Sequence, residues 1–533
     1  MKRIIRATQI FIFFLVPMLF LTMLAGVNSA NAATTILPPQ NLAVPTLGFT
    51  DTTITLIWEK PSEYSKVVSY EVYQNGSLVK STTKLNYTIA GLTPNTTYNF
   101  SVRAKDANQN QSIDSNILKQ STTTATVIFN VLDYGAVGDG STINTKAIQK
   151  AIDACSPGGK VVIPMGTFKS GAIFLKSDMT LEINGTLLGS DNNSDYPFTS
   201  MRFPYYPTKN YMGLINAYAT PYGSMSNVRI CGTGTVSGGT LLDKDATLTL
   251  LGKLENFKGN SARGDMITVK GVTNLYLGGL TLINPAMHTI FVSYCKNITV
   301  DGIKANTYDL QNADGIDLAT SDNTKIFNCV FDTGDDCINF NAGVGADGEK
   351  EGIACSNIRV FNCVTKRGHG GVVFGSYTAG WIKNVLIEDC VFDGTDRGLR
   401  FKTNREHGGG AENVIARDIT MKNILYEAIF FDSRYPSAYP AASAPGQFRH
   451  ITIRNVTCEN ARSYGIFIYG LADSYFSDIQ CYNVTLNNTK GAFITNAKDI
   501  MMDTVTFGNS GSSPWNVSDS ASVKFIHCSP QPK

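Results

Sequence analysis

The sequence has little histidine, no closely spaced pair of cysteines and almost no excess of either charge. Its 45 basic and 43 acidic residues leave a net charge of +2. This balance gives no indication of a nucleic-acid partner, and any preference for a charged ligand must be local. Without a Cys-x-x-Cys pair, and with five scattered histidines, the sequence gives no pattern for a structural zinc site. Eleven cysteines is an odd number, so at least one thiol has no partner within the chain.

Phosphate-binding and membrane-spanning patterns are also missing from most of the chain. The glycines at 135, 138 and 140 are not followed by a lysine at the spacing of a phosphate-binding loop. After residue 24 no segment is long and apolar enough to cross a bilayer. The sequence therefore predicts a protein with no nucleotide cofactor and no membrane anchor in its later part.

The first 32 residues have the pattern of a secretion signal. Basic residues precede an apolar run at 10–24, and the small residues Ala30 and Ala32 follow at the distance expected of a cleavage site. A membrane anchor is the alternative, because the run is nearly long enough to span. Pro17 interrupts the run, which favours cleavage, so we expect a secreted, extracellular protein.

A small domain is predicted at 38–123. Short runs alternate apolar and polar residues, and turn sequences such as Asn75-Gly76 separate them. Trp58 lies in an early run, and Leu92-Thr93-Pro94 precedes Tyr98 as in the tyrosine corner of a β-sandwich. The segment resembles a fibronectin type III module, for which we expect a role as a spacer or in proximity to carbohydrate.

The second domain, 128–533, opens with one helical pattern at 144–155 and then repeats a strand pattern. The period of the repeats and the absence of helical spacing predict an all-β solenoid, best matched by a right-handed parallel β-helix, with the early helix as a cap. The repeats include NLYLGGLTLIN at 274, NITVDGIKAN at 297, NTKIFNCVFD at 323, NIRVFNCVTK at 357, NVLIEDCVFD at 384, NVIARDITMK at 413, HITIRNVTCEN at 450 and DIMMDTVTF at 499.

Stacked coils should place equivalent residues of these repeats above one another. Cysteine and asparagine recur at fixed points of the pattern, and free cysteine is commonly buried. We therefore expect the repeat cysteines to form an inward-facing ladder rather than a set of reactive thiols. They are Cys295, Cys329, Cys363, Cys390, Cys458 and Cys481.

Three aspartates are spaced by about one coil. Asp314 precedes Asp335 by 21 residues and Asp336 by 22. Because neighbouring parallel strands lie about 4.8 Å apart, the three carboxylates can meet at one place. Crowded carboxylates have pKa values pushed apart, so that one is protonated while others are ionised, as hydrolysis of an acetal requires. A turn satisfied by its own aspartate side chains is the alternative.

A histidine and a basic strand follow at later coils. His369 lies between glycines, and side-chain alternation should direct Leu399 and Phe401 to one face and Arg400 and Lys402 to the other. A cationic pair beside three aspartates would offset the repulsion of an acidic sugar, which favours a uronate substrate. Simple screening of the aspartates is the other interpretation.

These segments resemble the signatures of the polygalacturonase family, glycoside hydrolase family 28. The resemblance covers about 129–510, and Ala313 and Phe401 replace the threonine and isoleucine that the family usually shows. The four segments, in order, are Asn312-Ala313-Asp314, Gly334-Asp335-Asp336, Gly368-His369-Gly370 and Arg400-Phe401-Lys402.

The resemblance implies single-displacement hydrolysis with inversion and no cofactor or metal. It implies that Asp335 is the general acid and that Asp314 and Asp336 hold the attacking water. It further implies that His369 tunes the protonation of the acid. For the galacturonate at the cleavage site it implies binding by Asn312, Arg400 and Lys402. We expect a monomer with polygalacturonate or oligogalacturonate as its partner.

The mode of attack is indicated by a wider likeness to bacterial exo-acting poly-galacturonosidases. NPAMHTI at 284–290, GGGAENV at 408–414 and the leading type III module contribute to it. Tyrosine- and proline-rich insertions at 196–223 and 432–446 could close one end of a groove, or could only cover the flank of the solenoid. An endo-polygalacturonase and a rhamnogalacturonan hydrolase remain alternatives.

Two functions of other classes are also open. A pectate lyase would use the aspartates to hold calcium, and a basic residue to remove a proton. A non-catalytic solenoid that binds pectin would need no protonated carboxylate.

Overall fold

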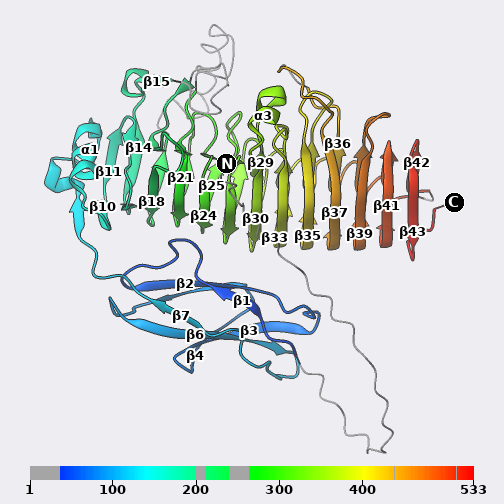
Figure 1. The fold of residues 1–533 in the computed structure, drawn as a ribbon, viewed down its shortest axis with the longest axis horizontal. Coiled ribbons are helices and arrows are strands. Elements are labelled where there is room, and N and C mark those ends of the chain that lie inside the picture. The colour runs from blue at the N-terminus through cyan, green and yellow to red at the C-terminus, as the bar shows by residue number, and fades with distance from the viewer. Residues whose placement is uncertain (1–35, 200–209, 239–262, 437–438, 512, 533) are drawn as a thin grey trace, which may run out of the picture.

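The computed structural model describes residues 36–199, 210–238, 263–436, 439–511 and 513–532. Figure 1 shows a small sandwich of strands and a long solenoid that the sandwich lies against. The predicted secretion signal lies outside the described residues. In the part of the chain that is described, none of the helices has the length and apolar character needed to cross a bilayer.

The sandwich consists of two antiparallel sheets around Trp58. Its indole is fully buried and packs edge-on against Tyr70, with ring centroids 5.8 Å apart. The hydroxyl of Tyr98 accepts a hydrogen bond of 3.0 Å from the backbone N–H of Thr93, which confirms the tyrosine corner. One sheet contains β1 (Gln40–Ala43), β2 (Thr53–Glu59) and β5 (Asn86–Ala90), and the other β4 (Ser77–Thr82), β3 (Val67–Gln74), β6 (Thr97–Asp106) and β7 (Leu118–Ser121).

The solenoid is a parallel β-helix, as the repeats predict. Its larger sheet has 22 strands. These are β8 (Ile128–Asn130), β9 (Asp139–Ile143), β10 (Gly159–Ile163), β11 (Thr167–Ser170), β13 (Met179–Ile183), β14 (Thr186–Gly189), β18 (Met225–Cys231), β19 (Thr235–Ser237), β21 (Val272–Gly278), β22 (Thr281–Ile283), β24 (Lys296–Asp301), β25 (Lys304–Thr307), β27 (Asp322–Phe327), β28 (Val330–Thr333), β30 (Cys355–Phe361), β31 (Val364–Thr365), β33 (Ile382–Asp393), β35 (Gly410–Lys422), β37 (Gln447–Cys458), β39 (Phe476–Asn487), β41 (Ala497–Gly508) and β43 (Ala521–Ile526).

The second sheet of the solenoid has 12 strands, all parallel and in sequence order. They are β12 (Ile173–Phe174), β17 (Ile215–Tyr218), β20 (Ile267–Lys270), β23 (Ile290–Ser293), β26 (Ile316–Ala319), β29 (Ile338–Asn341), β32 (Val372–Phe374), β34 (Leu399–Lys402), β36 (Ile429–Asp432), β38 (Ile466–Tyr469), β40 (Ala492–Thr495) and β42 (Trp515–Ser518). The other elements of the described residues are the pair β15 (Phe198–Thr199) and β16 (Asn210–Tyr211), helix α1 (Thr145–Ala154), helix α3 (Gly345–Glu351) and the 3-10 turns η1 (Val131–Tyr134) and η2 (Asn193–Asp195).

Apolar side chains that keep the same register from coil to coil fill the core of the solenoid. In the 12-stranded sheet Ile290 pairs with Ile316, and Ile316 pairs with Ile338, so each buried isoleucine lies directly on the next. Burial of one such side chain stabilises the fold by about 1.5–3 kcal/mol. Helix α1 buries Ile148 and Ile152 at the end of the stack, as the predicted cap requires.

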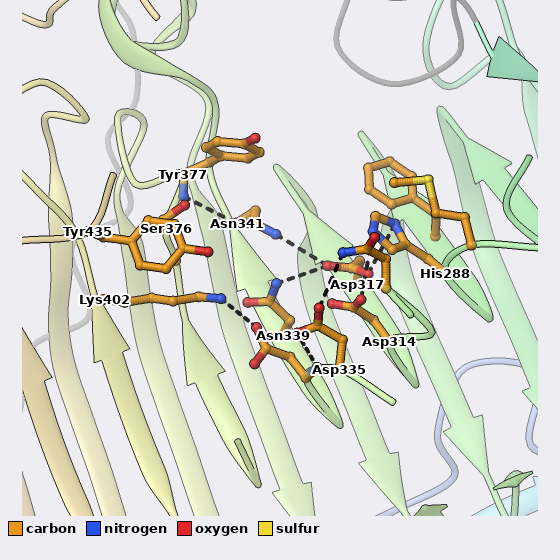
Figure 2. Close-up of a pocket in the computed structure, with 15 residues that line it drawn as sticks. His288, Asp314, Asp317, Asp335, Asn339, Asn341, Ser376, Tyr377, Lys402 and Tyr435 are labelled. Carbon is orange, nitrogen blue, oxygen red and sulfur yellow. Dashed lines mark hydrogen bonds and ion pairs between the residues drawn. The ribbon is translucent and has the colours of Figure 1, made fainter. Parts of the chain in front are cut away.

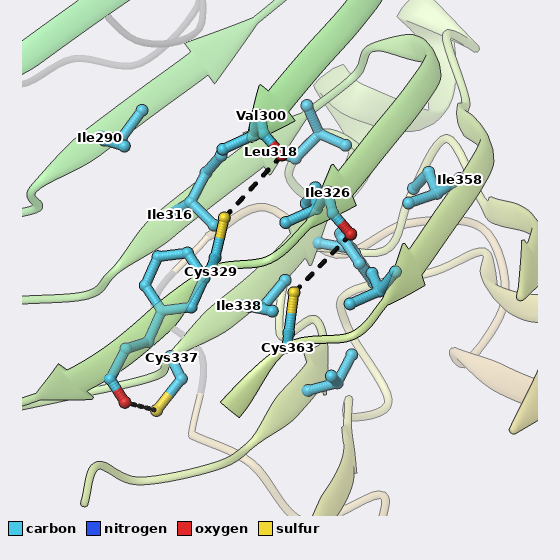
Figure 3. Close-up of a cluster of buried hydrophobic side chains, with 14 of the residues drawn as sticks. Ile290, Val300, Ile316, Leu318, Ile326, Cys329, Cys337, Ile338, Ile358 and Cys363 are labelled. Atoms are coloured by element: carbon cyan, nitrogen blue, oxygen red, sulfur yellow. Dashed lines mark hydrogen bonds between the residues drawn. The ribbon is translucent and has the colours of Figure 1, made fainter. Parts of the chain in front are cut away.

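The repeat cysteines line the interior of the stack, as predicted, but only three of the six are stacked on one another. Cys329, Cys363 and Cys390 precede valines that pair from coil to coil, whereas Cys458 and Cys481 are in register with Met421 and Ile453. Figure 3 shows Cys329 and Cys363 among buried isoleucines and valines. All eleven cysteines lie in the described residues and have free thiols. Burial raises the pKa of the Cys295 thiol to about 12, so this cysteine is a packing residue and not a nucleophile.

Stacked asparagines mark one corner of each coil. Asn274, Asn297 and Asn323 have φ angles of 62°, 58° and 57°, in the left-handed region that asparagine tolerates. The side-chain amide of Asn297 donates to Asn274 (2.9 Å), and that of Asn323 donates to Asn297 (2.8 Å). The recurrence of asparagine in the repeats therefore reflects both the turn and the ladder.

The sandwich is fixed to the 22-stranded sheet by buried charges. Lys60 lies 2.6 Å from both Asp389 and Asp418 of the solenoid. Arg359 donates to the carbonyl of Trp58 (2.8 Å) and pairs with Glu388. The site described below lies on the 12-stranded sheet, so the sandwich leaves it uncovered.

Candidate active site

The three predicted aspartates meet because of the register of β26 and β29. Ile316 pairs with Ile338, and Asp314 and Asp336 each stand two residues before these partners. The three carboxylates of Asp314, Asp335 and Asp336 each bring an oxygen within 4.8 Å of the others. The sequence spacing of about one coil therefore gave the correct cluster (Figure 2).

His369 lies beside the first of the paired aspartates. Its Nδ1 is 2.8 Å from Oδ1 of Asp335, and its backbone N–H donates to the Asp335 carbonyl (3.0 Å). The imidazole is 49% exposed, so it can exchange protons with solvent. Asn312 approaches the other oxygen of Asp335 through its side-chain amide at 3.3 Å.

The basic pair contacts Asp336. Nη1 of Arg400 is 2.8 Å from one carboxylate oxygen, and Nζ of Lys402 is 2.6 Å from the other. Leu399 and Phe401 are fully buried in the solenoid, so side-chain alternation predicted the two faces of β34 correctly. Arg400 and Lys402 lie on β34, three coils after the coil of Asp314, and their side chains reach back to the acidic cluster.

The environments of Asp314 and Asp335 push their pKa values in opposite directions. Burial raises the pKa of Asp314 well above its usual range, and the charges of Asp317, Asp335 and Asp336 add to this effect. Burial also disfavours ionisation of Asp335. The hydrogen bond with His369 and the charges of Lys402 and Arg400 outweigh that effect and lower the Asp335 pKa below its usual range.

Of the pair formed by Asp335 and His369, the histidine is the group that favours the proton. The hydrogen bond with Asp335 raises the pKa of His369, although burial opposes the change. The expected division into protonated and ionised groups is therefore present, with Asp314 and His369 as the groups that favour the proton.

Sequence reasoning missed His288 and Asp317. Nδ1 of His288 is 3.3 Å from Oδ2 of Asp317, and its Nε2 is 3.7 Å from Oδ1 of Asp314. Asp317 also accepts a hydrogen bond of 2.9 Å from the amide of Asn339, its register partner on β29. The signal was available, because Asp317 is the one polar residue of β26 and Asn339 lies at the matching position of β29.

These groups surround a cavity of about 230 Å³. Tyr435 belongs to the insertion at 432–446 and lines the cavity, with its ring centroid 5.1 Å from Nζ of Lys402. This insertion is therefore a wall of the cavity. The insertion at 196–223 lies partly outside the described residues, at 200–209. The lining residues are Met287, His288, Phe291, Asn312, Asp314, Asp317, Asp335, Asp336, Asn339, Asn341, Gly375, Ser376, Tyr377, Lys402 and Tyr435.

Comparison with known families assigns both domains. Residues 155–505 match the model of glycosyl hydrolases family 28, and residues 37–118 match the fibronectin type III domain. The chain belongs to glycosyl hydrolase family 28. The cluster described above lies within the part of the chain that matches family 28, and the type III module precedes that part.

Individual relatives match most of the chain. The family 28 chain is 34% identical to an exo-poly-alpha-D-galacturonosidase of Dickeya chrysanthemi, covering 91% of this chain and 93% of the relative. It superposes on a family 28 exopolygalacturonase of Yersinia enterocolitica with a TM-score of 0.85 and 33% identity, covering 92% and 99% of the two chains. A hyperthermoactive exopolygalacturonase of Thermotoga maritima matches with a TM-score of 0.61 and 25% identity, over 74% and 91%.

Proposed function

We propose that the protein is a secreted glycosidase that hydrolyses the α-1,4 bonds of polygalacturonate from the non-reducing end, with inversion. The observation that carries the proposal is one site in which three carboxylates adjoin a histidine and two cations. The exo-acting relatives that match over nine-tenths of the chain support the substrate and the mode of attack. The N-terminal sequence supports export.

Asp335 is the general acid in this mechanism. The substrate-free site keeps a proton between His369 Nδ1 and Asp335 Oδ1, where the two atoms are 2.8 Å apart. A bound uronate adds negative charge close by, which raises the affinity of Asp335 for this proton. Asp335 then gives the proton to the glycosidic oxygen as the bond from that oxygen to C1 breaks.

The attacking water is held by Asp314 and Asp336. Its oxygen forms the new bond to C1 on the face opposite the leaving oxygen, and its proton passes to Asp336, since Asp314 itself favours the protonated form. Arg400 and Lys402 fix Asp336 in place. Lys402 also borders the cavity, so it can bind the substrate carboxylate while it still contacts Asp336. The binding and screening interpretations of this lysine are therefore compatible.

The charge balance of the site disfavours a calcium-dependent lyase. Asp336 is paired with two cations and Asp335 with His369, so two of the three carboxylates already have positive partners. A calcium ion would have to displace these partners or be repelled by them. Hydrolysis needs no such displacement.

Product analysis in the presence of a chelator tests the proposed function. Culture medium from expressing cells, incubated with unesterified polygalacturonate and EDTA, should release saturated mono- or disaccharides from the earliest times, with a slow fall in viscosity. Unsaturated, ultraviolet-absorbing products that need calcium would indicate a lyase. Mixed oligomers with a rapid fall in viscosity would contradict exo action, and activity confined to washed cells would contradict export.

The pH profile tests the role of His369. Its raised pKa means that the histidine keeps its proton below that pKa and loses it as the pH rises through it. In His369→Gln the proton must be held by Asp335 alone, so the alkaline limb of kcat should move to lower pH. His450→Gln, at a histidine paired with Asp478 on the 22-stranded sheet, is the control and should keep the parent profile. An unmoved limb in His369→Gln would remove the histidine from this role.

A further inference from the structure

Beyond the cavity, the outward face of the 12-stranded sheet changes from polar to aromatic. Arg400 is in register with Phe430 of β36, Phe430 with Phe467 of β38, and Phe467 with Phe493 of β40. The three rings form an offset stack with centroid separations of 5.3 and 5.2 Å and interplanar angles of 14° and 15°. This column leads directly away from the site toward the C-terminal coils, at the yellow-to-red end of Figure 1.

Tyrosines widen this column into a surface. The ring of Tyr469 is nearly parallel to that of Phe493, with centroids 6.2 Å apart, and Tyr464 lies 5.9 Å from Phe467. We call this set the aromatic surface. It comprises Phe430, Tyr464, Phe467, Tyr469 and Phe493. Phe430 is buried, and the other four are partly exposed.

The aromatic surface is not required to fill the solenoid. A separate inner ladder serves that purpose, since Phe374, Phe401 and Phe431 stack with centroid separations of 4.2 Å and are fully buried. The outer rings leave part of their apolar area in contact with water. Partly exposed aromatic residues gathered along one column, next to a cavity, are typical of a ligand-contacting surface.

An arginine adds a charged donor to these rings. The guanidinium of Arg434 lies 3.8 Å from the ring centroid of Tyr469 and 5.7 Å from that of Phe467. Asp432 binds its Nε and Nη2 at 2.9 Å, which holds the guanidinium in place. Within the described residues no hydrogen bond joins its Nη1, and the side chain is 49% exposed. Nη1 is therefore placed to donate to a carboxylate that lies over the rings.

We propose that the aromatic surface binds the uncleaved part of the polygalacturonate chain, on the leaving-group side of the cavity. This inference rests on the proposed function. A galacturonate ring has an apolar C–H face that can lie against an aromatic side chain, and a carboxylate that Arg434 can bind. A chain that is cut from its end must extend out of the cavity on one side. The aromatic surface lies on a path open to it, because Phe430 is the register partner of Arg400.

Substrates of two lengths separate the aromatic surface from the cavity. Trigalacturonate is long enough to fill the cavity, whereas long polygalacturonate also extends over β38 and β40. The test variant is the double substitution Phe467→Leu and Phe493→Leu, which keeps apolar bulk but removes the rings, with Arg434→Gln as an independent second variant. The matched control replaces two half-exposed aromatic residues of the 22-stranded sheet, Tyr482→Leu and Phe525→Leu.

The double variant should raise KM for long polygalacturonate by about tenfold, because leucine keeps apolar contact but lacks the flat face on which a sugar ring can lie. Its kinetics on trigalacturonate should stay within about twofold of the parent. Arg434→Gln should show the same length dependence, and the control should show none. Equal effects on both substrates, or no effect on the long chain, would overturn the proposal.

Two further outcomes are distinguishable. A change from dimer to monomer in the double variant, seen by sedimentation, would identify the surface as a contact between copies of this chain and would also overturn the proposal. Failure of the parent protein to cleave either substrate would instead refute the proposed function. Binding of long polygalacturonate to the Asp335→Asn protein, with and without the two leucines, measures the aromatic surface without turnover.

Discussion

Replacing Asp335 with Asn should lower turnover of polygalacturonate by on the order of 10³-fold or more, the range expected when a general acid is removed. Asparagine has nearly the same shape and keeps the contact with Asn312, but it has no acidic proton to give to the leaving oxygen. The protein should remain folded and should still bind oligogalacturonate. Initial rates by reducing-sugar assay, with binding by calorimetry, measure the two effects separately.

A nearby aspartate outside the cavity supplies the control. Asp332 lies three residues earlier on β28 and pairs with Arg367 at 2.7 Å. Asp332→Asn should keep turnover close to that of the parent. Full activity in Asp335→Asn would show that the proton comes from another group, for which Asp314 would be the first choice because its pKa is raised.

Replacing Glu388 with Ala should lower the free energy of unfolding by about 3–5 kcal/mol, because it leaves buried arginines without their partner. Glu388 is 0% exposed and binds both Arg359 and Arg417. Arg359 also donates to Trp58 of the sandwich, so the contact between the two domains should weaken as well. Denaturant unfolding gives the loss of stability, and limited proteolysis of the connection between β7 and β8, residues 122–127, reports release of the sandwich.

Glu412 is the matched control for this stability prediction. It pairs with Arg449 and Lys383 on the same sheet, but its partners are 38% and 36% exposed. Exposed ion pairs contribute about 0–1 kcal/mol, so Glu412→Ala should lose little stability. Similar losses in the two variants would show that the buried cluster does not hold the sandwich in place.

Repetition made most of the fold predictable. One repeat outline gave the parallel stack, and its period brought Asp314 to Asp336 because a coil returns the chain to the same place on the sheet. Alternation along one strand separated Leu399 and Phe401 from Arg400 and Lys402. These inferences needed only the spacing of residues along the chain.

Contacts between distant segments could not be inferred in this way. Lys60 reaches Asp389 and Asp418 across the domain boundary, and no local pattern marks these three residues as partners. Crowding predicted that the pKa values of the aspartates would separate, but the direction for Asp335 depends on the position of His369. Loop conformation sets that position, and residue spacing does not determine it.

The attachment of the sandwich to the solenoid limits the orientations in which the enzyme can bind a polymeric substrate. A module on a loose tether searches a large volume and raises the local concentration of a partner. Lys60, held between two aspartates, and Arg359, which binds the backbone of Trp58, instead join the module and the solenoid into a single rigid object. Any glycan that the module touches must therefore approach at a fixed distance and angle from the reactive carboxylates.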